Sequence, residues 1–198
     1  MIAKRVFDVL VSGMALLVLL PLFFGIAATI KLDSPGPVFF RQKRVGRFGK
    51  TFRIHKFRTM VTNAEVNGPL ITVGADARVT RVGAVLRKRK LDELPQLIDV
   101  LIGSMSLVGP RPEVPQYIAY YPAEARELVL SVRPGITDSA SIEFKDENEV
   151  LERAKDPYGA YINDVLPIKI GYYTDYVRNR TFLGDLRIIG ATICAIVR

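Results

Sequence analysis

An uncharged stretch of 22 residues, VLVSGMALLVLLPLFFGIAATI at positions 9–30, constrains the fold more than any other feature of this chain. A straight helix of that length is about 33 Å long, which is enough to cross the hydrocarbon core of a bilayer. The stretch is long for a cleaved signal peptide, and a basic segment follows it rather than a typical secreted domain. We therefore expect a helix that remains in the membrane.

Two features bear on whether this helix spans the membrane or re-enters it. Pro21, near the middle, removes one backbone hydrogen bond and kinks a helix. Lys4 and Arg5 precede the segment and basic residues at 31, 41, 43 and 44 follow it, so the positive-inside rule draws both ends to the cytoplasmic side. These residues alone leave a re-entrant helix and a simple spanning helix both open. We expect the turn cluster at 33–37 to end the helix, and Asp8 to pair with Lys4 or Arg5.

Charge is distributed unevenly along the chain. Residues 1–90 contain 17 Lys and Arg against 4 Asp and Glu, whereas residues 91–198 contain 11 against 16. A basic half implies an anionic partner, such as nucleic acid, lipid headgroups or a phosphorylated substrate. A single cysteine, Cys194, and a single histidine, His55, exclude an internal disulfide, a four-thiolate zinc site and multi-histidine metal sites.

Eight Lys and Arg residues and no acid lie between Arg41 and Arg58. Residues 38–40 and 51–54 read as short strands with Gly46 and Gly49 in the turn between them, which predicts a β-hairpin. Its basic face is either simply solvated or held against anionic headgroups, which contribute about 1 kcal/mol per basic residue. The adjacent membrane segment and the lack of a nucleic-acid motif favour lipid or a lipid-linked phosphate over nucleic acid. The GRFGKT run is not a P-loop, because only two residues separate its glycines and a strand follows it.

An acid pair, Asp92 and Glu93, stands between the basic run at 87–90 and an apolar helix face in the sequence KLDELPQL. Apolar residues at 94, 97, 98 and 101 have helical spacing, and Gly103 is the expected stop. On this pattern Asp92 is the N-cap, with Pro95 in the first turn. The simplest interpretation is that Asp92 caps the helix and Glu93 favours its dipole.

The same geometry also suits phosphate chemistry. An ionised aspartate can attack phosphorus and form an aspartyl-phosphate ester, and Glu93 beside Asp92 can hold Mg²⁺, which prefers a few carboxylates together with phosphate oxygens. The cationic run would neutralise charge on the transferred group. The turns GPRP at 109–112 and RPG at 133–135 each fix an arginine, Arg111 and Arg133, in a rigid position suited to phosphate.

Several motifs in this order resemble the bacterial sugar transferase family, the monotopic phosphoglycosyl transferases that act on polyprenyl phosphate, over almost the whole chain. The motifs are KRVFD at 4–8, SPGPVF at 34–39, FRIHKFRTM at 52–60, LDELPQL at 91–97, GSMSLVGPRP at 103–112, RPGIT at 133–137 and DL at 185–186.

The resemblance implies a two-step reaction that requires Mg²⁺. A UDP-sugar gives its phosphosugar to Asp92 with release of UMP, and polyprenyl (undecaprenyl) phosphate then attacks this intermediate. Glu93 is the implied Mg²⁺ ligand, and the membrane helix is implied to re-enter at Pro21. The expected phosphate contacts are Lys56, Arg87, Arg111 and Arg133, and Asp185 is expected to have a supporting polar role.

We therefore expect an α/β (α+β, helix-rich) protein on the cytoplasmic face of the bacterial inner membrane. A re-entrant membrane helix would occupy residues 1–33 and a catalytic domain residues 34–198, with a short β-hairpin and interfacial amphipathic helices such as residues 182–198. Expected partners are UDP-sugar, polyprenyl phosphate and membrane lipids, with a homo-oligomer possible and no nucleic acid. A non-catalytic lipid-binding adaptor and a membrane-tethered nucleic-acid binder are the alternatives. Residues 138–161 depart from the common family pattern, so the sugar stays open.

Overall fold

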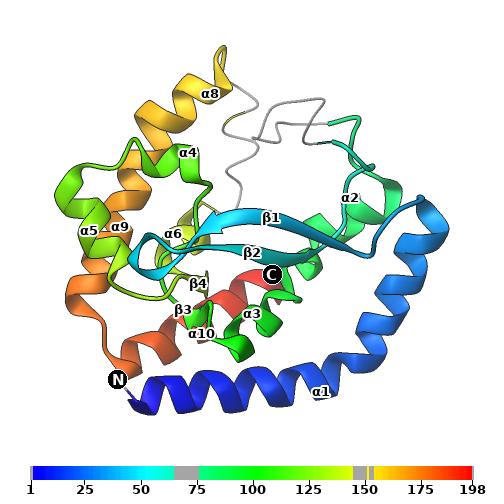
Figure 1. The fold of residues 1–198 in the computed structure, drawn as a ribbon, viewed down its shortest axis with the longest axis horizontal. Coiled ribbons are helices and arrows are strands. Elements are labelled where there is room, and N and C mark those ends of the chain that lie inside the picture. Colours follow the sequence, from blue (N-terminus) through cyan, green and yellow to red (C-terminus); the bar gives the residue numbers. More distant parts are fainter. Residues whose placement is uncertain (1, 65–75, 145–150, 152–153, 198) are drawn as a thin grey trace.

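A computed structural model describes residues 2–64, 76–144, 151 and 154–197 (Figure 1). The chain is helix-rich with two small two-stranded sheets, which confirms the expected helix-rich α+β composition. In chain order the elements are α1 (Ile2–Asp33), β1 (Phe39–Val45), η1 (Arg47–Gly49), β2 (Thr51–Phe57), α2 (Arg81–Lys88), η2 (Leu91–Glu93), α3 (Gln96–Ile102), β3 (Ser106–Val108), α4 (Pro115–Ile118), α5 (Ala123–Leu130), β4 (Gly135–Thr137), α6 (Ser139–Glu143), α8 (Pro157–Ala160), η3 (Tyr161–Val165), α9 (Leu166–Asn179) and α10 (Phe182–Val197).

Helix α1 is a single element of 32 residues that contains Pro21. It runs along one edge of the molecule and then bends toward the β1–β2 hairpin (Figure 1). By length and composition it is apolar enough to cross a membrane, and only 11% of its most apolar window is buried. Its last residue is Asp33, so the expected end at the turn cluster is confirmed. This segment is one bent helix and not a pair of helices, and its re-entrant course in a membrane stays a prediction.

The start of α1 is attached to the body of the protein by polar contacts. Lys4 Nζ donates to Asp185 Oδ2 on α10 at 2.6 Å and to the Val108 carbonyl oxygen at 3.1 Å. Arg5 donates from Nη1 to the Val100 carbonyl oxygen at 2.6 Å, close to the carboxyl end of α3. A guanidinium at the end of a helix satisfies carbonyl groups that have no partner within the helix.

The expected pairing of Asp8 with Lys4 or Arg5 is wrong. The Asp8 carboxylate is buried and accepts hydrogen bonds from Ser106 Oγ at 2.8 Å and the Leu107 N–H at 3.3 Å. The physical reason is that a buried carboxylate needs hydrogen-bond donors, and β3, which runs past this turn of α1, supplies them.

The C-terminal end of α1 is also attached to the body of the protein by hydrogen bonds. Arg58 Nη2 donates to the Ser34 carbonyl oxygen at 2.7 Å and Arg58 Nη1 to the Pro35 carbonyl oxygen at 2.5 Å. Asp33 Oδ2 accepts from the Val82 N–H at 3.0 Å, which ties the end of α1 to α2. Buried side chains of α1, β2 and α2 form a small apolar cluster beside this junction: Ile26, Ile30, Phe57 and Leu86.

Strands β1 and β2 form the expected antiparallel hairpin, in a register that pairs Phe39 with Phe57 and Val45 with Thr51. Both strands are longer than the sequence indicated, because the basic side chains alternate along them without interrupting the ladder. The turn contains Gly49 at φ +74°, a conformation that glycine adopts without steric cost. The added length of β2 brings Lys56 into a regular strand.

A second, parallel pair of three-residue strands, β3 and β4, was not expected from the sequence. Ser106 pairs with Gly135 and Val108 with Thr137. A Cβ added to Gly135 would lie 2.1 Å from the Gly109 nitrogen, so the two motif turns approach as closely as glycine allows. This pair joins the GPRP and RPG turns in space.

Candidate active site

The acid pair lies in the short 3₁₀ helix η2, not at the N-cap of α3. Lys90 adopts the left-handed conformation (φ +54°, ψ +19°), and the chain then makes a tight turn before α3 begins at Gln96 with Pro95 at its cap position. The predicted capping role of Asp92 is therefore wrong, because the sharp turn at Lys90 places this residue one turn before the helix. As a consequence, the Asp92 carboxylate is not used by the backbone of α3.

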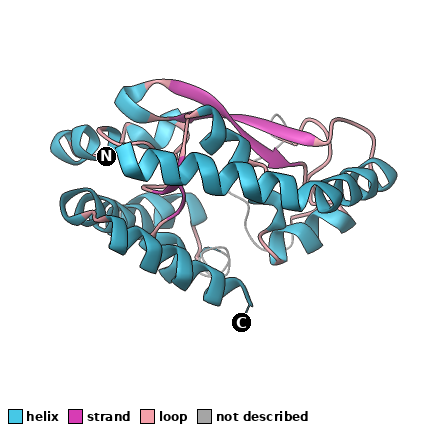
Figure 2. Cartoon of the chain, turned by 90° about the horizontal axis from the view of Figure 1, so that it is seen from below, coloured by secondary structure: helices cyan, strands magenta, loops and turns pink. Residues whose placement is uncertain are grey.

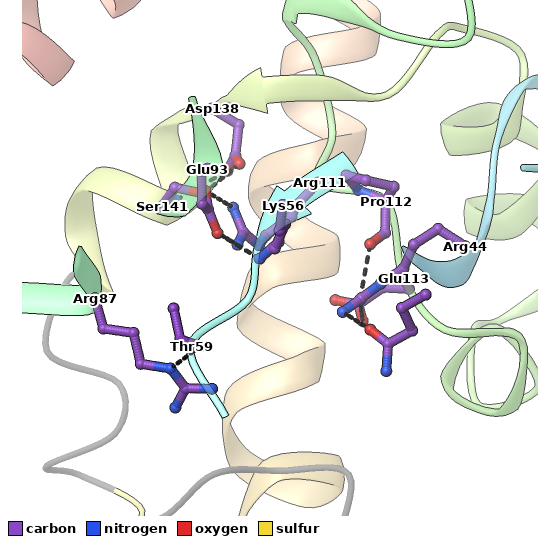
Figure 3. A network of polar contacts seen from close by, with 11 residues as sticks. Arg44, Lys56, Thr59, Arg87, Glu93, Arg111, Pro112, Glu113, Asp138 and Ser141 are labelled. Carbon is purple, nitrogen blue, oxygen red and sulfur yellow. Dashed lines mark hydrogen bonds and ion pairs between the residues drawn. The ribbon is translucent and has the colours of Figure 1, made fainter. Parts of the chain in front are cut away.

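Glu93 is held by two cations from distant parts of the chain (Figure 3). Lys56 Nζ donates to Oε1 at 2.7 Å. Arg111 donates to both carboxylate oxygens, from Nη1 to Oε2 at 3.1 Å and from Nη2 to Oε1. Burial by itself raises the pKa of Glu93, but Arg111 and Lys56 outweigh it and hold the pKa well below its usual value. Glu93 is therefore an anion fixed in an ion cluster.

Asp92 differs from its neighbour. Its residue is only 8% exposed, and within the described part of the chain its carboxylate accepts no hydrogen bond. Burial is the largest influence and raises the pKa of Asp92, while Lys56, Arg87 and Arg111 act in the opposite direction. The arrangement leaves a basic carboxylate oxygen uncommitted, among cations that can receive an anionic group.

Arg87 reaches this site from α2. Its Nε donates to Thr59 Oγ1 at 2.9 Å, which orients the guanidinium. Helix α2 can approach only because residue 83 is glycine, since a Cβ on Gly83 would lie 2.0 Å from the Thr59 carbonyl oxygen. Burial lowers the pKa of Arg87, and the charge of Asp92 opposes that effect. The expected basic run thus contributes Arg87 to the site.

A buried network behind Arg111 was missed by sequence reasoning. Arg44 Nη1 donates to the Pro112 carbonyl oxygen at 3.1 Å, and the Val45 N–H donates to the Glu113 carbonyl oxygen at 2.9 Å. The Glu113 side chain accepts from the Tyr161 hydroxyl at 3.0 Å. Strand β1 therefore anchors the loop that carries Arg111. The only sequence signal was that Glu113 directly follows the GPRP turn, and this position does not predict that Glu113 contacts Tyr161 or β1.

Asp138 is a second carboxyl group that sequence reasoning did not select. It follows β4, is 2% exposed, and accepts from the Ser141 N–H at 3.0 Å and Oγ at 2.6 Å as the N-cap of α6. Burial raises the pKa of Asp138, with the Ser141 hydrogen bonds and Arg111 opposing. It begins the segment at 138–161 whose role was left open, of which residues 145–150 and 152–153 lie outside the described residues.

Two of the predicted site residues have their contacts elsewhere. Arg133 Nε donates to the Gly103 carbonyl oxygen at 2.8 Å, and its charged neighbours are Arg5, Arg47 and Asp8. Asp185 pairs with Lys4 and accepts from the Tyr176 hydroxyl at 2.8 Å. The structure thus gathers Lys56, Arg87 and Arg111 around the acid pair, while phosphate contact by Arg133 and catalytic support by Asp185 stay predictions.

The expected magnesium ligand does not have the form of a ready metal site. Both oxygens of Glu93 already accept N–H donors from Lys56 and Arg111. Among the residues that the structure describes, no three Asp, Glu, His or Cys side chains converge as a metal-binding group. Asp92 and Glu93 in this arrangement do not fit a Mg²⁺ ion bound by the protein alone.

Fold and site together define a helix-rich class of protein with one long apolar N-terminal helix and an acid pair set in a cationic cluster. The family model described as bacterial sugar transferase matches residues 1–198. The chain belongs to the bacterial sugar transferase family, as its motifs indicated.

Curated relatives carry more specific names. The chain is 39% identical to the UDP-N-acetylgalactosamine-undecaprenyl-phosphate N-acetylgalactosaminephosphotransferase of Aeromonas hydrophila, over 98% of this chain and 43% of that protein. It is 39% identical to the UDP-glucose:undecaprenyl-phosphate glucose-1-phosphate transferase of Xanthomonas campestris pv. campestris, over 96% of this chain and 38% of that protein. It is 36% identical to the exopolysaccharide production protein ExoY of Sinorhizobium fredii, over 98% of this chain and 85% of that protein. The chain therefore spans about two fifths of the first two relatives.

Proposed function

We propose that this protein moves a phosphosugar from a UDP-sugar to polyprenyl (undecaprenyl) phosphate, releases UMP and so starts assembly of a surface glycan, either O-antigen, capsule, exopolysaccharide or glycoprotein. Membership of the family and the names of two relatives as undecaprenyl-phosphate sugar phosphotransferases support this proposal. The observation that carries it is the contrast between the uncommitted carboxylate of Asp92 and the ion-paired carboxylate of Glu93.

In the first step a carboxylate oxygen of Asp92 attacks the phosphorus that bears the sugar. The bond from that phosphorus to the bridging oxygen breaks, and UMP leaves with the bonding electrons. In the second step an oxygen of polyprenyl phosphate attacks the same phosphorus and releases the Asp92 carboxylate. The raised pKa of Asp92 makes its oxygen more basic, and hence a stronger nucleophile once ionised.

The cations around the acid pair have distinct roles in this proposal. Arg111 and Lys56 are fixed by Glu93 before substrate arrives, so their charge is preorganised toward the phosphate oxygens. Arg87 is oriented by Thr59, and its charge acts on Asp92. A guanidinium has five N–H donors, so Arg111 keeps donors for a phosphoryl group after it pairs with both oxygens of Glu93.

We further propose that α1 re-enters the membrane and leaves the catalytic part, residues 34–198, on the cytoplasmic face of the bacterial inner membrane. A straight helix of 32 residues would place its ends about 48 Å apart. Here both ends contact the same body, through Lys4 and Asp185 at one end and through Arg58 and Ser34 at the other.

The face seen from below supports this membrane placement. It presents α1 together with the C-terminal helix α10 (Figure 2). Exposed apolar side chains are present on both helices, among them Met14, Leu17 and Phe24 on α1 and Leu183 and Ile193 on α10. Apolar side chains on one face of a protein are stabilised by contact with lipid.

The deciding experiment is a UMP-release assay over a panel of UDP-sugars, with polyprenyl phosphate and Mg²⁺ present. We expect turnover with at least one sugar, and a phosphosugar adduct on Asp92 detectable by mass spectrometry when the lipid acceptor is omitted. The panel must be broad, because the two relatives are named for different sugars. Turnover that survives Asp92→Asn would refute the mechanism.

A non-catalytic lipid-binding adaptor is the second candidate, favoured by the exposed apolar side chains of α1. Both candidates predict that Asp92→Asn still binds liposomes. Only the enzyme predicts that the wild type releases UMP and that the variant does not.

A further inference from the structure

The carboxylate of Glu93 has little capacity left for a metal ion. A carboxylate offers about four lone-pair positions, and three N–H contacts from Lys56 and Arg111 occupy most of them. Mg²⁺ requires oxygen ligands at about 2.0–2.1 Å in near-octahedral geometry. An ammonium group 2.7 Å from Oε1 holds the position where such an ion would bind. A metal ion that binds Oε1 of Glu93 must displace a cation, and Oε2 keeps only one position without a donor.

Neighbouring carboxyl groups do not supply the missing ligands. Asp138 accepts two hydrogen bonds from Ser141 as a helix cap. Glu113 accepts from Tyr161 and lies behind the loop of Arg111. Asp92 is thus the one carboxylate at the site with uncommitted oxygens within the described residues, and a single carboxylate holds Mg²⁺ weakly unless phosphate oxygens complete the shell.

The charge of the cluster points the same way. Among the acid pair and the cations that act directly on it, two carboxylates, Asp92 and Glu93, face three cations, Lys56, Arg87 and Arg111, which leaves one net positive charge. A divalent cation is repelled by such a cluster. The diphosphate of a nucleotide sugar carries two negative charges, so its arrival makes the cluster net negative and attractive to a dication.

We propose that Mg²⁺ does not reside on this protein, and that it binds the acid-pair site only together with the diphosphate of the nucleotide sugar. This inference rests on the proposed function. The cations held by Glu93 oppose metal binding until the diphosphate adds its negative charge and its oxygen ligands to the site. By linkage, the diphosphate and the metal ion raise each other's affinity by the same factor.

The test uses Mn²⁺, which takes the same oxygen ligands and whose free ion gives a sharp electron paramagnetic resonance signal. The full chain in detergent or nanodiscs is titrated with Mn²⁺ alone, and then with a UDP-sugar analogue whose bridging oxygen is replaced by methylene. The analogue without protein supplies the background. We expect no stoichiometric binding to the free protein, one Mn²⁺ per chain with the analogue, and at least about a tenfold gain in affinity.

Variants separate the cation cluster from general charge effects. Lys56→Met removes one of the two donors to Oε1 of Glu93, together with the net positive charge, so Mn²⁺ should bind without the analogue. Adding Glu93→Gln to Lys56→Met should abolish that binding. Lys43→Met is the matched control, because Lys43 is an exposed residue of the same hairpin, and it should behave as the wild type does.

If one Mn²⁺ binds tightly to the wild type without the analogue, and Glu93→Gln loses that binding, this inference is wrong. The proposed function, which is measured by UMP release, would be unaffected. Absence of UMP release with every UDP-sugar would instead overturn the proposed function. The two failures are therefore distinguishable.

Discussion

Arg111 donates hydrogen bonds from its two terminal nitrogens to both carboxylate oxygens of Glu93, which lies 18 residues earlier in the sequence. This bidentate pairing fixes a guanidinium beside Asp92 before any substrate is present, and Arg44 holds the neighbouring Pro112 carbonyl from behind. The geometry of the pair depends on the planar fork of arginine, which a lysine of equal charge lacks.

Arg111→Lys should therefore retain the charge and lose the preorganisation. We expect the rate of UMP release to fall by about 10²-fold, comparable with the loss of one positioned donor, and the unfolding free energy to fall by about 1–2 kcal/mol. Steady-state kinetics and thermal unfolding in detergent measure the two effects. An unchanged rate with lowered stability would assign Arg111 a structural role only.

Asp92→Asn and Glu93→Gln should have opposite effects on stability, although both should abolish turnover. The raised pKa of Asp92 means that folding disfavours its ionised form, so a neutral side chain there should leave the melting temperature unchanged or higher at neutral pH. Glu93→Gln leaves two partly buried cations without their anion and should cost about 2 kcal/mol, between the values for exposed and for buried pairs. Thermal melting curves of the two variants and the wild type measure this difference. Equal decreases in melting temperature in both variants would contradict it.

The pH dependence of stability should follow Glu93. Its pKa is well below the usual value in the folded state, despite the opposing effect of burial. The ionised form therefore stabilises the fold above the pKa of the unfolded chain, about 4.3, and this contribution is lost as pH falls through the lower folded value. Chemical unfolding between pH 7 and pH 3 should show this loss in the wild type. Glu93→Gln should show a flatter profile.

The acidic limb of the activity profile should respond to Lys56. In the proposed mechanism UMP release requires ionised Asp92, so the rate should fall as pH drops through the pKa that burial has raised. Lys56 opposes that rise, and Lys56→Met should move the limb to higher pH. Single-turnover UMP release across pH 5–9 measures the shift, with Lys43→Met as the charge control. If the acidic limb of the pH–rate profile does not move in Lys56→Met, the charge of Lys56 does not influence the pKa of Asp92.

The re-entrant course of α1 can be tested by chemical labelling. In a Cys194→Ser background, single cysteines at Ala3 and Lys31 should both react with a membrane-impermeant maleimide from the cytoplasmic side, because both ends of α1 contact the same body. Cys194 is exposed and must be removed first. Labelling of the two positions from opposite sides of inverted vesicles would establish a spanning helix instead.

Local sequence determined those elements whose physical cause is local. An uncharged run of 22 residues avoids water only as a lipid-facing or buried helix, which predicted α1. Alternating side chains around two glycines predicted the β1–β2 hairpin, and a glycine free to adopt φ +94° predicted the end of α3 at Gly103. The motif resemblance identified the family and selected the acid pair.

Only the tertiary structure decided how the members of that pair differ. Glu93 meets Lys56 from 37 positions away and Arg111 from 18, while Asp92 is left without a donor in the described chain. The arginines of the two similar turns likewise have different partners, since Arg111 donates to Glu93 and Arg133 donates to the Gly103 carbonyl oxygen. Such partners depend on strand register and on which turns pack together, and neither is encoded in the spacing of neighbouring residues. The sequence named the charged groups, and the packing of distant segments determined which of them are paired.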